Sequence, residues 1–481
     1  MARMTRISLA ALATALIVTA PAAAETLKEA MAIAYDSNPD LLAARAFQRS
    51  LDEQVPQAIA GWMPRVTGQF QQFYSKNKSK TLRLTDGTFV NDNTFSGSNQ
   101  TLSANADIDF FRGFRNFNAL KGAKASVEAG RANLLLTEQS VLFDAVNAYM
   151  DVLRDEAVLR LNENNVKVLK RQLEATEDRF RVGEVTRTDV AQAEAAVAGA
   201  ESQRIQAEAT LATSRATYRR VIGNFPGSLE SDPPPPPLPG NEEDAVEIAL
   251  AENPAVVAAR LEERAARFDV AEAKGAVLPT FSGFYRYNRG NRPSLTFDPQ
   301  QFGFVGASNF FRGTQLGVSL TVPLYQSGAE YAEVRRQKQI RSQRMLQIMA
   351  AERQVMRDVR VAWENYRAAQ ARIESSQAQV RANEIAVEGA RQESTVGART
   401  VLDVLQTEQV LLDSQVNLVT ARRDEYVAAF ALLQAIGRLN AVALGLPVEI
   451  YDPTGYYEKV KYRLIGWGTP GPELVPEEAS D

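Results

Sequence analysis

The acidic residues with the most regular spacing belong to two Thr-x-x-Asp sequences, Thr186 to Asp189 and Thr400 to Asp403. This spacing is typical of a capping box, in which the two side chains accept the free amide hydrogens at a helix N-terminus. We favour the cap for Asp189; for Asp403 the cap and a second role are both left open.

Most other catalytic chemistry is excluded, because the 481-residue chain has no cysteine and no histidine. Disulfides, thiolate or imidazole metal sites and mechanisms with an imidazole base are therefore absent. Carboxylate-only glycoside chemistry is formally possible, but no convergent acid and base support an enzyme or a cofactor. Asp107 and Asp109 lack the loop spacing of a calcium site. The formal charge of 54 − 58 = −4 gives no case for nucleic-acid binding.

The first 24 residues are typical of a secretory signal peptide. Arg3 and Arg6 precede an apolar run over 7–18, and the small residues Ala22–Ala24 follow. The run is shorter than the ~20 residues of a membrane-spanning helix, so we favour cleavage after Ala24 over a retained anchor. No later segment is typical of such a helix, and the mean hydropathy is −0.25. An exported chain of this kind is soluble outside the cytoplasm or enters a membrane as β-strands.

One unit is used twice along the chain. Residues 30–45 match residues 245–260 at a shift of 215, and residues 182–190 match residues 396–404 at a shift of 214. A proline-rich segment, which suits a stiff extended linker, joins the two copies. We therefore expect a signal peptide at 1–24, repeat 1 at 25–230, a linker at 231–241, repeat 2 at 242–446, and a C-terminal segment with a disordered tail at 447–481.

Each repeat is predicted to begin with a helix and two strands. Asn38-Pro39 and Asn253-Pro254 suit a helix N-cap followed by proline, and a helix of about six turns ends before Pro64 or Pro279. Apolar residues then alternate with other residues over about ten positions, which predicts strands with two different faces. The alternating positions are Leu102, Ala104, Ala106, Ile108 and Phe110 in repeat 1, and Phe281, Gly283, Tyr285, Tyr287, Leu316, Val318, Leu320 and Val322 in repeat 2.

The segments between paired strands, residues 86–98 and 288–312, are rich in Asn, Gly, Ser and Pro, which predicts long hairpin loops. Proline-free sequence of strong helix formers follows each strand pair. The stretch from Arg115 to Arg181 corresponds to a helix of roughly 100 Å. A short interruption ends each stretch, so we expect helical hairpins whose turns need a positive φ at Gly183 and Gly397.

These elements predict an α+β membrane protein. Four strands leave two open edges, and a membrane barrel must be closed, which takes at least about eight strands. The chain must therefore oligomerise: two copies supply eight strands and three supply twelve. The long hairpins all leave one side of such a barrel and form a tube of helices.

The combination of motifs resembles the TolC family of outer-membrane efflux and export channels. The resemblance rests on the two-unit layout, the prolines at helix–strand junctions, the Val-Gly-x-x-Thr-x-x-Asp-Val tips, and the strand end Val322-Pro323-Leu324-Tyr325. The stretch from Leu444 to Tyr457 looks most like the members that serve type I protein secretion. The junction prolines are Pro64, Pro279 and Pro323.

This resemblance implies a homotrimer with a twelve-stranded barrel, four strands from each chain, in the outer membrane of a Gram-negative bacterium. The barrel continues into a helical tunnel in the periplasm and contacts outer-membrane lipid. An inner-membrane pump of the ABC or proton-driven class would supply the energy for protein secretion or drug efflux. A periplasmic adaptor would dock on the tips Val182, Gly183, Val396 and Gly397.

The resemblance also implies roles for residues near the tips. An acidic ring narrows the family's tunnel entrance; its first position matches Asp403, and its second is Gln406 in this sequence. The family's closed state has links between hairpins that match Arg399 with Thr188, and Asp189 with a tyrosine position that is Ser394 here. Arg399 also suits a plain solvated helix end.

A competing hypothesis is a non-conducting periplasmic scaffold, in which the long helices form an ordinary coiled-coil rod. Such a rod has no use for four alternating strands in matched pairs, so the strands favour the channel. The cargo, whether protein, drug or metal, leaves no mark on the sequence of a passive duct.

Overall fold

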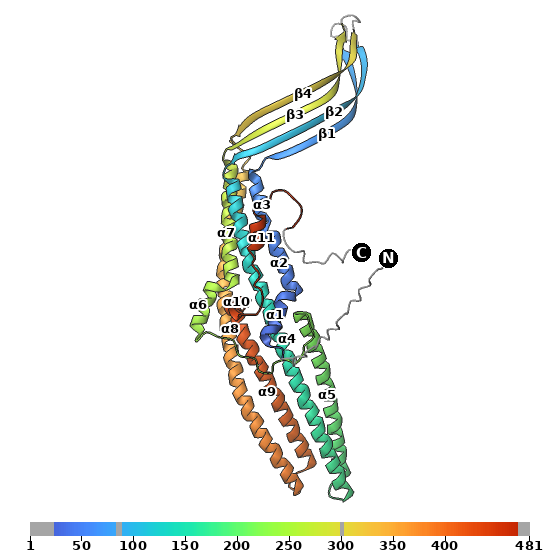
Figure 1. The fold of residues 1–481 in the computed structure, drawn as a ribbon, viewed down its shortest axis with the longest axis vertical. Helices are drawn as coiled ribbons and strands as arrows, with labels where there is room; N and C mark the ends of the chain where they lie inside the picture. The colour runs from blue at the N-terminus through green and yellow to red at the C-terminus, as the bar shows by residue number, and fades with distance from the viewer. Residues whose placement is uncertain (1–23, 83–88, 299–302, 470–481) are drawn as a thin grey trace, which may run out of the picture. The chain divides into compact units, whose positions relative to one another are not determined.

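The computed structural model describes residues 24–82, 89–298 and 303–469. The chain divides into two compact units, each built from segments of both repeats (Figure 1). The hairpin unit comprises the described residues up to Leu42 with 137–253 and 356–450, and the sheet unit comprises 43–136, 254–355 and the described residues from Tyr451 onward. The compact units therefore cut across the sequence repeats rather than coinciding with them.

The sheet unit contains one antiparallel sheet in the order β1-β2-β3-β4. Its strands are β1 (Arg65–Leu82), β2 (Phe89–Arg112), β3 (Thr280–Asp298) and β4 (Gly303–Thr321). They are 18 to 24 residues long, about twice the predicted length. Pro64 and Pro279 directly precede β1 and β3, and Pro323 follows the end of β4 by two residues.

The predicted long hairpin loops are wrong. Within the described residues, 89–98 belong to β2, and 288–298 and 303–312 belong to β3 and β4. Asn, Ser and Gly favour turns in isolation, but here a partner strand satisfies every second backbone group, and the ladder outweighs the local preference. Residues 83–88 and 299–302, which also belong to or adjoin the predicted loops, lie outside the described residues.

The helices of the sheet unit confirm the prediction for one repeat and correct it for the other. In repeat 2, α7 (Pro254–Lys274) and the 3-10 turn η2 (Gly275–Val277) run to Pro279 as expected. In repeat 1 the helix is broken into α2 (Pro39–Asp52), α3 (Gln54–Ile59) and the 3-10 turn η1 (Ala60–Trp62). The break follows from Pro56, which has no N–H to donate to the carbonyl of Asp52 one turn earlier. The short helix α11 (Gly455–Val460) completes the unit.

The hairpin unit is a set of antiparallel helices. α4 (Arg115–Arg181) and α8 (Ala329–Thr395) reach their turns in this unit, and α5 (Arg187–Ile222) and α9 (Val401–Ile436) return from them. The bounds of α4 are those expected from the sequence. None of the helices in the described part of the chain combines the length and apolar character needed to cross a membrane.

Smaller elements close the hairpin unit around a buried core. They are α1 (Leu27–Ser37), α6 (Glu242–Glu252) and α10 (Ala441–Leu444). Glycines end both return helices, at Gly223 with φ 107° and at Gly437 with φ 93°, as helix C-caps commonly do. The core includes Tyr149 and Tyr218, both fully buried. The Tyr149 hydroxyl donates to the Glu25 carbonyl at 2.8 Å, and Glu25 also forms an isolated parallel β-bridge with Leu229.

Candidate functional site: hairpin tips and sheet faces

The two hairpin tips share one backbone geometry. In the first, Gly183 has φ +81° and its N–H donates to the Phe180 carbonyl at 3.0 Å. In the second, Gly397 has φ +78° and donates to the Ser394 carbonyl at 3.2 Å. Positive φ disfavours any residue with a Cβ, so the expected turn role of both glycines is confirmed.

Each return helix starts with the expected capping box. The Asp189 carboxylate accepts from the Thr186 N–H at 2.8 Å, and the Asp403 carboxylate accepts from the Thr400 N–H at 3.1 Å. The hydroxyls of both threonines also donate to these carboxylates. The hydrogen bonds from Thr400, aided by the nearby charge of Arg399, lower the pKa of Asp403. Asp403 is therefore an anion at neutral pH that is fixed in orientation at a helix start.

The other residues predicted at the tips lie on several surfaces. Val182 and Val396 are the most exposed apolar residues of the tips, at 72% and 79%. Gln406 and Thr188 are exposed, whereas Ser394 is buried. Gln406 lies one helical turn after Asp403 on α9, so the two side chains share one face of the helix, as expected.

Arg399 pairs within its own hairpin. Its guanidinium lies 2.5 Å from the carboxylate of Glu393 at the end of α8. The first hairpin carries a matching ion pair between Arg179 and Glu184 at 3.2 Å. A link from Arg399 to Thr188 stays a prediction, since it belongs to an assembled closed state.

Apolar packing joins the start of α9, just behind the second tip, to the first hairpin several turns behind its own tip. Val401 and Leu405 at the start of α9 pack in one buried cluster with Val166 and Leu169 of α4 and Ala200 of α5. This cluster fixes the orientation of α9, so Asp403 points away from the apolar contact that holds its helix.

An ion pair between a buried glutamate and an exposed arginine joins α8 to α9 in the same region. Glu408 is only 7% exposed, and its carboxylate accepts from Arg391 Nε at 2.7 Å. Burial of a carboxylate requires such a partner. No local pattern predicts this pair, because the two residues are 17 positions apart and meet only through the hairpin.

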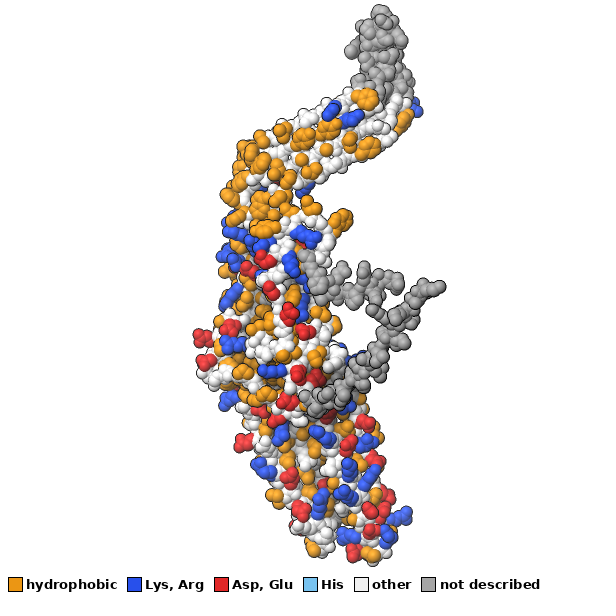
Figure 2. All heavy atoms as spheres, in the orientation of Figure 1, with side chains coloured by type: hydrophobic (Ala, Val, Ile, Leu, Met, Phe, Trp, Pro, Cys, Tyr) orange, Lys and Arg blue, Asp and Glu red, His pale blue; other side chains and the backbone are white. Residues whose placement is uncertain are grey.

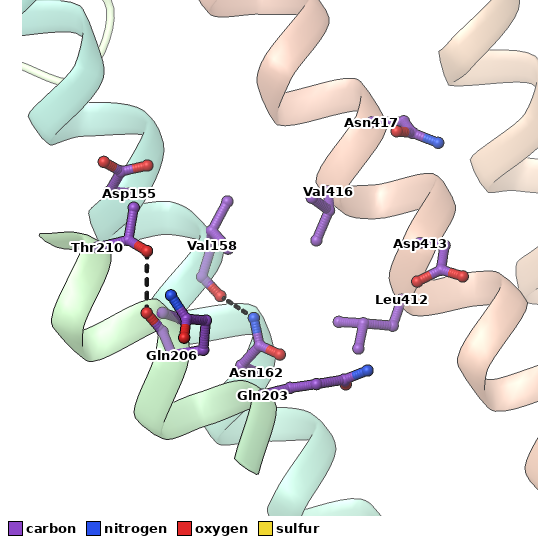
Figure 3. Close-up of a pocket in the computed structure, with 11 residues that line it drawn as sticks. Asp155, Val158, Asn162, Gln203, Gln206, Thr210, Leu412, Asp413, Val416 and Asn417 are labelled. Atoms are coloured by element: carbon purple, nitrogen blue, oxygen red, sulfur yellow. Dashed lines mark hydrogen bonds between the residues drawn. The ribbon is translucent and has the colours of Figure 1, made fainter. Parts of the chain in front are cut away.

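A polar groove lies further along the hairpin unit between α4, α5 and α9 (Figure 3). Its volume is about 550 Å³, and its lining includes Asp155, Asn162, Gln203, Gln206, Asp413 and Asn417. Both carboxylates are engaged: Asp155 accepts from Arg154 at 2.7 Å and from the Ser214 hydroxyl, and Asp413 accepts from Gln409 at 2.9 Å. The groove therefore offers amides and paired acids, with no free acid and base pair for catalysis.

The sheet has one apolar and one polar face. Residues that are paired across all four strands lie on one face, and the row Val66, Ala106, Tyr285, Leu316 is apolar. The next row, Thr67, Asn105, Arg286, Gln315, lies on the opposite face and is polar. Leu316 is 83% exposed. Figure 2 shows hydrophobic side chains spread along the sheet.

Known proteins resemble this chain over most of its length. The profile of the family described as "Outer membrane efflux protein" matches residues 31–224 and again residues 245–438. The outer membrane efflux protein BepC of Brucella suis is 33% identical over 451 residues, which cover 93% of each chain. The chain belongs to the outer membrane efflux protein family.

Other relatives agree with this assignment. The outer membrane protein TolC of Vibrio cholerae is 26% identical over 443 residues, covering 87% of this chain and 92% of that protein. The solved structure of VceC, also from Vibrio cholerae, superimposes with a TM-score of 0.65 at 21% identity and covers 85% of this chain and 96% of its own. The resemblance to the TolC family is thus confirmed, and the protein is an outer-membrane channel of a Gram-negative bacterium with its tunnel in the periplasm.

The family is one of channels rather than enzymes. Among the described residues, no group of three or more acidic side chains is placed to hold a metal ion. Asp109 instead pairs with Arg112 at 3.5 Å. The candidate functional features are the fixed charges at the hairpin tips in the hairpin unit and the two faces of the sheet in the sheet unit.

Proposed function

We propose that three copies of this chain form a passive export duct through the outer membrane. The observation that carries the proposal is the sheet, which has two open edges, β1 and β4, and one apolar face. Unpaired edges cannot face lipid, because their backbone groups would lack hydrogen bonds. Three copies joined edge to edge supply twelve strands and close the barrel, with the apolar face toward lipid and the polar face toward the lumen.

Exposed apolar side chains on the helices support the same assembly. In the sheet unit, α8 exposes Met345, Leu346 and Met349 by about half or more. In the hairpin unit, the same helix exposes Ile385 by 75%. Apolar residues repeated along one helix indicate a contact with another copy. In the trimer the hairpins of three chains line a periplasmic tunnel.

The tips form the tunnel entrance in this proposal. Three copies of Asp403 and Gln406 converge on the axis and favour cations. Arg399, Thr188 and Asp189 supply the links of the closed state, and the exposed tip residues Val182 and Val396 with their glycines receive a periplasmic adaptor. The junction prolines Pro64, Pro279 and Pro323 mark the change from barrel to tunnel.

Transport energy comes from an inner-membrane pump of the ABC or proton-driven class. The duct then serves type I protein secretion, small-molecule efflux, or both, according to the pump that the adaptor brings. The chain boundaries follow the repeats: mature protein from residue 25, two repeats around the linker at 231–241, and a periplasmic C-terminal segment from residue 447.

Single-channel conductance in planar bilayers tests this proposal. The wild type is compared with Asp403→Ala and with the matched control Thr400→Ala, which disrupts the same capping box but keeps the charge of Asp403. A trimeric mass with small cation-selective openings, which lose selectivity only in Asp403→Ala, is expected.

Equal selectivity in all three proteins would keep the duct but move its constriction elsewhere. Absence of insertion and conductance would favour the periplasmic scaffold. The control separates the loss of a helix cap, which both variants share, from the loss of a charge on the axis.

A further inference from the structure

Two arginines face each other on the apolar side of the sheet. Arg289 of β3 and Arg312 of β4 are direct partners in the antiparallel ladder. Their row continues through Leu102 of β2 to Phe70 of β1, both exposed apolar residues. Side chains in such pairs have Cβ atoms about 5 Å apart, and like charges directly opposite each other are destabilising.

Among the described side chains, no carboxylate on this face lies beside the two arginines. The rows from Phe281 to Asn291, followed across the strands that each row pairs, contain no acidic residue on the apolar side. Both arginine side chains are exposed, and the Arg312 guanidinium stacks over the Tyr287 ring at 5.7 Å. β1, the strand that a neighbouring copy would pair with β4, contains no Asp or Glu at all. Assembly therefore cannot supply the missing anion either.

The position of the pair along the strand indicates which lipid layer it meets. Eight residues separate Leu320, at the helix end of the sheet, from Arg312, which corresponds to about 27 Å along the strand. With the usual strand tilt of ~40° this is about 20 Å across the membrane, close to the ~25 Å apolar band of outer-membrane barrels. With the helices in the periplasm, Arg289 and Arg312 lie at the outer boundary of the hydrocarbon.

We propose that Arg289 and Arg312 together bind a phosphate group of a phosphorylated glycolipid in the outer leaflet. The proposal rests on the barrel placement given under Proposed function. A guanidinium binds phosphate through two parallel N–H···O bonds, and two of them on adjacent strands can hold one phosphate between them. The bound anion cancels the repulsion between the arginines, and the acyl chains lie against Phe70, Leu102 and the apolar rows below.

Native mass spectrometry of the detergent-solubilised protein, titrated with diphosphorylated lipid A, tests this site. The variants are R289Q/R312Q and, as a matched control, R286Q. Arg286 is on the same strand and also stacks on an aromatic ring, Phe284 at 4.8 Å, but it lies on the polar face. We expect R289Q/R312Q to bind lipid A at least tenfold more weakly than the wild type, and R286Q to bind like the wild type.

Titrations with other lipids and with inorganic phosphate distinguish a glycolipid phosphate from other sources of the anion. Dephosphorylated lipid A and phosphatidylglycerol should each bind the wild type at least tenfold more weakly, and millimolar inorganic phosphate should not displace lipid A. Equal binding by R289Q/R312Q, an equal loss in R286Q, equal binding of phosphatidylglycerol, or displacement by phosphate would each overturn the proposal.

The same native mass spectra show whether each variant assembles into the oligomer. The single-channel conductance of R289Q/R312Q should match that of the wild type. This separates failure of the lipid site from failure of the duct. If the double glutamine variant does not assemble, R289K/R312K keeps both charges but loses the bidentate geometry. It should bind lipid A three- to tenfold more weakly, and unchanged binding would contradict a guanidinium site.

Discussion

Leu316→Arg tests whether the apolar face of the sheet meets lipid. Leu316 lies midway between Leu320 and Arg312 on β4, so in the proposed barrel it is near the middle of the bilayer. An arginine on the lipid side costs about 2–4 kcal/mol at the midplane and about 0–1 kcal/mol near the interface. The folding equilibrium in lipid should therefore fall by about 30-fold to about 900-fold.

The matched control is Gln69→Arg on β1, which lies on the polar face with the uncharged Ser103 of β2 as its partner. Urea titration in phospholipid vesicles, read by protease protection of the sheet, measures both variants beside the wild type. Leu320→Arg, at the boundary, should lose much less than Leu316→Arg. Equal losses for Leu316→Arg and Gln69→Arg would refute the assignment of the two faces and, with it, the orientation of the barrel.

Two further predictions concern the helices. Gly397→Ala should destabilise the protein by about 1–2 kcal/mol, because φ is +78° at this position. The control Gly389→Ala lies inside α8 with open space around it and should stabilise the protein by about 0.5–1 kcal/mol. Thermal unfolding midpoints that shift in the same direction for both variants would contradict the turn geometry. Burial raises the pKa of Asp52 to about 6, so its proton is held more tightly in the folded state, and stability should decline by roughly 3 kcal/mol as the pH rises from about 4 to about 6. Asp52→Asn should remove that slope and stabilise the protein at pH 7.5, and denaturant titrations that keep the same pH slope in the variant would exclude Asp52 as its source.

The elements that the sequence predicted well are those specified by nearby residues. The absence of proline and the Val-Gly interruption determine the end of α4 at Arg181, and each Thr-x-x-Asp sequence determines the start of the helix that follows it. The side chain of Asn38 accepts from the Asp40 N–H at 2.9 Å, as expected of an N-cap before Pro39. All these signals act between residues within about one helical turn, so they can be recognised in the sequence without knowledge of the tertiary fold.

The features that escaped prediction depend on contacts between distant segments. Residues 288–298 form a strand because β4 pairs with all of them and β2 pairs with residues 288–291, and no local preference predicts this pairing. The pairing of Arg391 with Glu408 requires the hairpin, and the opposition of Arg289 and Arg312 requires the register of two strands. The break after Asp52 is different: Pro56 was a visible local signal and would have predicted it.

The tips of this chain suggest that a closed channel would be held by fewer polar contacts than the family pattern provides. Gln406 and Ser394 stand where the family pattern has a second acid and a tyrosine, so the proposed constriction carries fewer acids and the buried Ser394 offers Asp189 a shorter partner. Arg399 already pairs with Glu393 of its own hairpin, so a contact with Thr188 must compete with that ion pair. An exposed ion pair contributes little by itself, but it lowers the gain from any alternative partner. We therefore expect small forces from a docked adaptor to be enough to open this entrance.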